Sequence, residues 1–161
     1  MVFVMAVLLL PPLLIFGIYH LSLWFNLLGI RRMVFWRRVA LTSVVAHTLL
    51  AAGFFAFSYL DYQANRDLVF VGQTLDSYLF NRSEFWSLMV IFDTLPTLTV
   101  LGLFALLDRF DVALPQLVGV TVAIVFLLGS FQWYWIGAGI GALFERIWAG
   151  LKGPGAEDGW P

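Results

Sequence analysis

Long apolar stretches separated by short polar segments dominate this chain of 161 residues. A bilayer has a hydrocarbon core about 30 Å thick, which takes roughly 20 helical residues to cross. The pattern predicts four membrane-crossing helices, over residues 12–30, 39–60, 85–107 and 113–144. Because lipid offers no hydrogen bonds to the backbone, the expected fold is all-α, with the four helices in an antiparallel bundle. We expect residues 1–150 to form this single transmembrane domain.

Prolines modify the first and third stretches. Pro11 and Pro12 interrupt the first, so we expect its helix to begin at residue 12, after an apolar lead-in. In the third stretch Pro96 has no N–H and frees a backbone carbonyl one turn earlier, which predicts a kink. Nearby threonines can bond the polar groups exposed there: Thr94, Thr97 and Thr99.

The fourth stretch is longer than one crossing needs. Residues 112–144 carry no formal charge, and as a helix they would extend about 50 Å. We expect this helix to be strongly tilted or to continue beyond the lipid, with the aromatic residues 133–135 at the outer interface. Gln132 then lies near that interface. Gly137 and Gly141, in a Gly-x-x-x-Gly spacing, allow another helix to approach closely.

Two segments lie outside the predicted spans. Residues 61–84 contain four acidic residues and two arginines, but also the apolar stretch 68–80, which is too short to cross the bilayer. This composition predicts an external segment that lies along the membrane interface or packs on a partner. Residues 151–161 are rich in glycine and proline and predict an extended C-terminal tail.

Composition excludes several classes of protein. Hydrophobic residues make up 61% of the chain and charged residues only 12%, too few charges to cover a soluble domain of this size. The net charge of −1 and the lack of a long basic tract exclude nucleic-acid binding. The chain has no cysteine, which excludes disulfides and thiol chemistry.

The strongest orientation signal is a short arginine-rich segment after the first stretch, containing Arg31, Arg32, Arg37 and Arg38. By the positive-inside rule this segment faces the cytoplasm. An even number of crossings then places both termini outside the cytoplasm. We expect an integral protein of the bacterial plasma (inner) membrane.

Ionisable residues lie near the middle of three predicted spans, namely His20, His47 and Asp93. An ionised carboxylate at this depth costs from about 2.5 to more than 10 kcal/mol, so Asp93 must be protonated, paired or shielded. His47 and Asp93 lie at similar depth, and neighbouring antiparallel helices could bring them together. The pair would then be a proton relay or ligand site, or else a structural contact that fixes helix register. Gln132 is a further intramembrane polar residue.

The histidines also raise the question of a cofactor. His20 and His47, on two helices of a bundle, are what a b-type haem with two imidazole ligands requires. The sequence leaves open whether the protein binds no cofactor, a haem, or a pigment or lipid. A metal site is not expected, since a single carboxylate lies at this depth. No catalytic motif is present, so we do not expect an enzyme.

The favoured function is a non-catalytic accessory or scaffolding subunit of a larger membrane complex, energy-transducing in a respiratory or photosynthetic chain. Its partners would be the lipid bilayer and other integral membrane subunits. One alternative is a redox or proton-handling subunit, associated with b-type haem or quinone, that uses His20, His47 and Asp93. Another is a self-assembling channel or small transporter with Gly137 and Gly141 at the interface between protomers.

Overall fold

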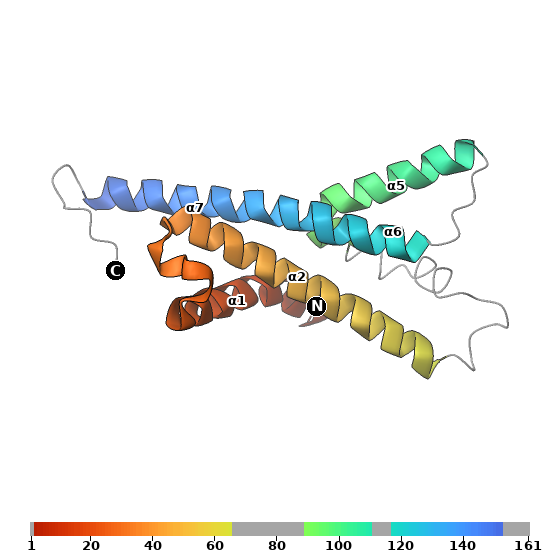
Figure 1. The fold of residues 1–161 in the computed structure, drawn as a ribbon, viewed down its shortest axis with the longest axis horizontal. Coiled ribbons are helices and arrows are strands. Elements are labelled where there is room, and N and C mark those ends of the chain that lie inside the picture. The colour runs from red at the N-terminus through yellow and green to blue at the C-terminus, as the bar shows by residue number, and fades with distance from the viewer. Residues whose placement is uncertain (1, 66–88, 111–116, 153–161) are drawn as a thin grey trace. The chain divides into compact units, whose positions relative to one another are not determined.

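The computed structural model describes residues 2–65, 89–110 and 117–152, and these are almost entirely helical (Figure 1). The all-α prediction is confirmed for them. Most of the predicted interfacial segment (66–84) and of the predicted tail (153–161) lies outside the described residues. The elements in chain order are α1 (Val2–Phe25), the 3₁₀ helix η1 (Leu27–Arg32), α2 (Phe35–Ala64), α5 (Thr94–Arg109), α6 (Leu117–Ile124), the π-helix η2 (Val125–Gly129) and α7 (Ser130–Lys152).

Two helices are long and apolar enough to cross a membrane, judged by length and composition alone. One is α2, with 30 residues, and the other is the continuous helix Gly119–Leu151 of 33 residues, which includes parts of α6 and α7 with η2 between them. At about 1.5 Å per residue, they extend roughly 45 and 50 Å. Two shorter apolar helical segments, Pro11–Phe25 and Thr94–Leu107, accompany them.

The chain divides into two compact units. Unit 1 comprises Met1–Ala46 and Trp133–Pro161, and unit 2 comprises His47–Gln132. The helices α2 and α7 each contribute residues to both units. The two units are described separately below.

In unit 1, α1 differs from the prediction at both ends. The helix continues through Pro11 and Pro12, so the predicted interruption is wrong; the two missing N–H groups remove two backbone hydrogen bonds but leave the rest of the ladder in place. It ends at Phe25, not at residue 30, because Asn26 has the left-handed conformation (φ 48°). Asparagine enters this region more readily than most residues, and Gly29 (φ 68°) follows in it.

Two arginines of the cluster bond to backbone carbonyls at these helix ends. Arg31 donates from Nε to the carbonyl of Leu23 (2.6 Å) and from Nη2 to that of Trp24 (3.0 Å), at the end of α1. Arg38 donates in the same way to the carbonyls of Met33 (2.7 Å) and Arg31 (2.9 Å). The last carbonyls of a helix have no partner within it, so these side chains cap the connection between α1 and α2.

The first turns of α2 pack closely on α7 within unit 1 (Figure 1). A Cβ atom added to Gly141 would lie 2.6 Å from the Cα of Trp36, and one added to Gly137 would lie 2.9 Å from the Cα of Ala40. The Glu145 side chain of α7 also accepts a hydrogen bond from the Trp36 N–H (3.1 Å). The two glycines therefore face α2 and allow the close approach. Near them, the Glu145 carboxylate bonds the Trp36 N–H, one of the first-turn N–H groups of α2 that have no partner within the helix.

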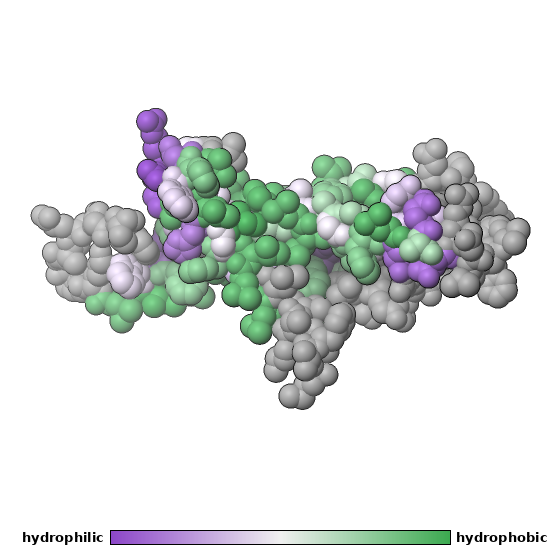
Figure 2. Space-filling model, turned by 90° about the horizontal axis from the view of Figure 1, so that it is seen from below, coloured by the Kyte–Doolittle hydropathy of each residue, from purple (hydrophilic) through white to green (hydrophobic). Residues whose placement is uncertain are grey.

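The described part of unit 2 consists of α2 after residue 46, residues 89–109, α6 and η2, and it buries polar residues beside a hydrophobic cluster of Ala51, Met89 and Val125. Among its described residues, the buried ones are Ala51, Met89, Pro96, Val100, Val125 and Gly129 together with the polar His47, Ser58, Asp93, Thr97 and Thr121. Large hydrophobic side chains are exposed instead, among them Phe57, Leu60, Ile91, Leu98 and Leu127. Figure 2 shows hydrophobic residues over much of the described surface on the face drawn. This inverted distribution is typical of helices packed in lipid.

Candidate functional site

The candidate site lies at a break in the third apolar helix. Residues 89–92 are helical, Asp93 is not, and α5 begins at Thr94. The Asp93 N–H still donates to the Met89 carbonyl (2.8 Å). Pro96 has no N–H, so the carbonyl four residues earlier, that of Phe92, loses its helical donor. The predicted kink therefore lies at the carboxylate itself.

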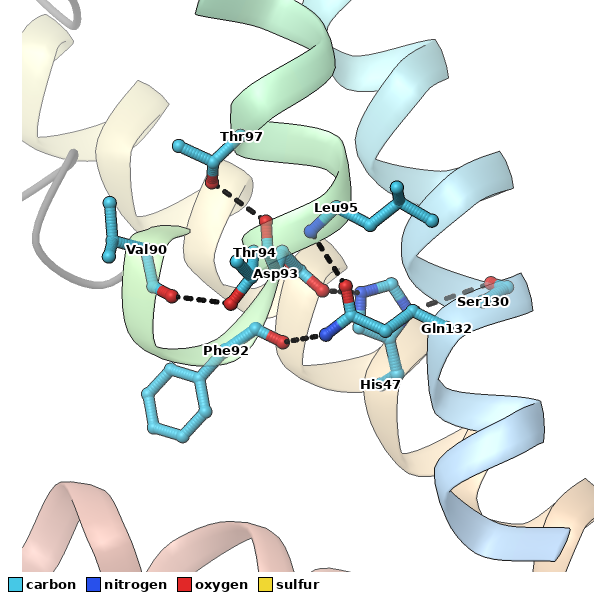
Figure 3. Close-up of polar contacts among 9 residues, drawn as sticks. All are labelled: His47, Val90, Phe92, Asp93, Thr94, Leu95, Thr97, Ser130 and Gln132. Atoms are coloured by element: carbon cyan, nitrogen blue, oxygen red, sulfur yellow. Dashed lines mark hydrogen bonds and ion pairs between the residues drawn. The ribbon is translucent and has the colours of Figure 1, made fainter. Parts of the chain in front are cut away.

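One amide side chain, that of Gln132 at the start of α7, bonds the groups displaced by this break (Figure 3). Its Nε2 donates to the Phe92 carbonyl (3.3 Å), and its Oε1 accepts from the Leu95 N–H (2.8 Å). In a continuous helix these two groups would bond to residues 96 and 91. Gln132 was expected apart from Asp93, near the outer interface. Its contacts instead belong to the same site.

Threonines around the break bond backwards to carbonyls four residues earlier, as Figure 3 shows for Thr94 and Thr97. Thr94 donates to the Val90 carbonyl (2.9 Å) and Thr97 to the Asp93 carbonyl (2.7 Å). Hydroxyl groups that bond in this way favour a bend in the helix. They satisfy local carbonyls, as the sequence suggested, while the Phe92 carbonyl bonds to Gln132.

The structure brings His47 of α2 to Asp93. The imidazole Nε2 lies 2.9 Å from the carboxylate Oδ1, and the two side chains are only 3% and 10% exposed. This is the distance of an ion pair. Few water molecules can reach either group, so a charge on one must be compensated by protein groups, of which the other member of the pair is one.

Gly129 and Ser130 complete the surroundings of the imidazole. A Cβ atom added to Gly129 would lie 2.5 Å from His47 Cε1 and Nε2 and 2.9 Å from Asp93 Oδ1, so the ring occupies the space that any other residue would fill. The Ser130 hydroxyl lies 3.5 Å from His47 Nδ1 (Figure 3). Neither residue was among the predicted site residues. A glycine inside a helix lowers helix stability by about 1 kcal/mol relative to alanine. A glycine at position 129 of a long apolar helix could therefore have indicated a packing role.

The two histidines have different surroundings. His20 belongs to unit 1 and is exposed, with its ring 4.4 Å from that of Phe16 and 5.7 Å from that of Tyr19. His47 is buried, and both of its ring nitrogens lie against protein groups, Asp93 and Ser130. A haem ligand must turn one ring nitrogen toward the iron. The arrangement at His47 does not fit such a ligand.

Serine, histidine and aspartate lie next to one another here, as in a hydrolase triad. Acyl transfer also needs free N–H donors for the oxyanion. The N–H of Ser130 already donates to helix carbonyls, at Phe126 and Leu127, and the Gln132 amide is bonded to Phe92. These two donors near the serine thus already form structural hydrogen bonds. This geometry favours a proton-holding or helix-fixing role over nucleophilic catalysis.

Metal binding has no support from the described residues, among which no group of three histidine, aspartate or glutamate side chains could hold an ion. Comparisons with protein-family models, with curated proteins and with solved structures found no match. The chemistry of the site therefore follows from its own geometry.

Proposed function

We propose that this chain is an integral membrane protein with four crossings, and that it acts as a non-catalytic accessory subunit of a larger complex in the bacterial inner membrane. The observation that carries the proposal is the inverted distribution of side chains, with polar groups buried between helices and large apolar groups exposed. In water such a surface would aggregate. In lipid it is the ordinary exterior of a helix bundle.

Four crossings are supported by the two long apolar helices together with the two shorter ones. Segment Pro11–Phe25 belongs to a helix that begins at Val2, and Thr94–Leu107 follows the helical residues 89–92 across the break. Each combination provides about 20 residues, enough for one crossing.

The length of the last helix supports a partner. Large apolar residues remain exposed on α7 as far as Ile147, Trp148 and Leu151. A helix of about 50 Å exceeds the hydrocarbon thickness by about 20 Å, unless it is strongly tilted. The part outside the hydrocarbon would keep its apolar residues from water only by contact with another protein. An energy-transducing complex, whose subunits are themselves rich in membrane helices, is a suitable partner.

Purification from native membranes in a mild detergent tests this proposal. We expect the tagged chain to elute with larger membrane proteins, and to lose thermal stability once separated from them, since partners stabilise the folded state by binding it. A homogeneous, stable particle that contains only this chain would contradict the proposal and favour a self-assembling channel or transporter.

A further inference from the structure

We propose that His47 and Asp93 form a reversible proton-binding site, and that Gln132 couples the protonation of this site to the break in the helix at Asp93. This inference concerns the chain itself and does not depend on its being an accessory subunit. Three observations carry it: the burial of the pair, the half-buried serine hydroxyl beside it, and the position of the amide across the break.

The pair has one proton whose position can change. With Asp93 ionised and His47 protonated, or with both groups neutral, the site has no net charge. Transfer of the proton from Nε2 to Oδ1 breaks one N–H bond, forms one O–H bond and exchanges these two states. Uptake of a further proton from hydronium releases water and leaves the site with one positive charge. Loss of the proton to water instead leaves an ionised carboxylate beside a neutral imidazole, so the site can gain or lose one proton from its neutral states.

Ser130 extends the site toward the surface. Asp93 and His47 are buried, whereas Ser130 is half-buried. A hydroxyl can both donate and accept a hydrogen bond, so it can pass a proton to or from Nδ1 while its own proton moves on. Described neighbours of the pair include the uncharged Gly129 on η2 and Ser130 on α7.

Gln132 bonds both flanks of the protonatable residue. Its partners, the Phe92 carbonyl and the Leu95 N–H, lie on either side of Asp93 in the chain. The position of the carboxylate relative to His47 therefore depends on a break that this amide holds in one geometry. A change in the attraction between carboxylate and imidazole acts on the same segment. Coupling of this kind is reciprocal, so loss of the amide must alter proton binding. Gln132 is accordingly a positioning residue.

The chain is well suited to a direct test because it contains only two histidines. The full chain, labelled with ¹⁵N-histidine and placed in lipid nanodiscs, reports the protonation of each ring by NMR. The exposed His20 is the internal reference, and a His20→Gln variant assigns the signals. In wild type we expect the His47 signals to change with pH. In Asp93→Asn we expect the pH at which the His47 signals change to move by at least tenfold in proton concentration, because the carboxylate beside the ring is lost.

Gln132→Leu tests the coupling. We expect it to move the midpoint of the His47 transition at least threefold in proton concentration, with His20 unaffected, and we expect Gly119→Ala, in the open part of α6, to leave both unchanged. Infrared difference spectra of the wild type provide a second readout, a protonated-carboxyl band that Asp93→Asn removes. Wild-type His47 signals and carboxyl bands that stay constant over about two pH units on either side of the ordinary histidine pKa of about 6.5 would overturn the proton site. An unchanged midpoint in a folded Gln132→Leu would overturn the coupling.

Discussion

At the scale of single residues, the site depends on Gly129, the smallest of its residues. Gly129 leaves the space that the His47 ring occupies, within contact distance of Asp93 as well. The glycine is thus a condition for burying the pair at all. Its cost in helix stability is offset by the polar contact that it permits.

Alanine at position 129 should destabilise the protein. The added Cβ would stand 2.5 Å from two atoms of the imidazole, which must move away from the carboxylate. Overpacking of this kind costs about 1 to 3 kcal/mol. Gly119→Ala is the matched control, because nothing lies within 4 Å of the atom that it adds; it should be neutral or stabilising by up to about 1 kcal/mol. Thermal unfolding in nanodiscs measures both. Equal melting temperatures for the two variants would contradict this account of Gly129.

The sequence predicted part of the site for physical reasons that remain visible in the structure. A buried carboxylate needs compensation, which identified Asp93 and its relation to His47. Pro96 lacks an N–H, which identified the bend. Gln132 and Ser130 could not be assigned, because their direction depends on the phase of the helix after residue 124. A five-residue π-helix sets that phase, and no apolar periodicity marks it.

At the scale of elements, the helix ends were the least predictable feature. Apolar composition continues from residue 1 to residue 30, so it could not show that α1 ends at Asn26. A single left-handed residue and the capping side chain of Arg31 fix that end. The arginines expected to determine orientation therefore also have a local structural role.

The break at Asp93 allows a test of how two elements share hydrogen bonds. Gln132→Leu leaves the Phe92 carbonyl and the Leu95 N–H without their amide partner, and we expect a loss of about 1 to 3 kcal/mol in unfolding free energy. Pro96→Ala supplies a new N–H to the same carbonyl. The cost of Gln132→Leu should therefore be smaller when Pro96→Ala is also present. Reversible unfolding of the four proteins in mixed micelles measures the coupling, and additive costs would show that the amide does not replace the missing helical bond.

At the scale of the whole molecule, orientation in the membrane is the property most open to measurement. The chain has no cysteine, so single cysteines can be introduced at exposed positions without background. Suitable sites are Val34, Gln63 and Gly150. By the positive-inside rule, the arginine cluster predicts that Val34 faces the cytoplasm, and the proposed topology puts one and three crossings between it and the other two. An impermeant thiol reagent added outside should label Gln63→Cys and Gly150→Cys but not Val34→Cys. Labelling of Val34→Cys and Gly150→Cys from the same side would show that the number of crossings between them is even.

The π-helix η2 also has a consequence for the evolution of this chain. A π turn is equivalent to an α turn with one extra residue. Losing one residue there would let the remaining four form an ordinary α turn, so everything that follows would keep nearly the same direction around the helix axis. Gln132 and Ser130 would then still face Asp93 and His47. In a homologous chain, a one-residue alignment gap between positions 125 and 129 would thus be compatible with this polar site, whereas the same five residues wound as a regular α-helix would turn Gln132 and Ser130 away by about 100°.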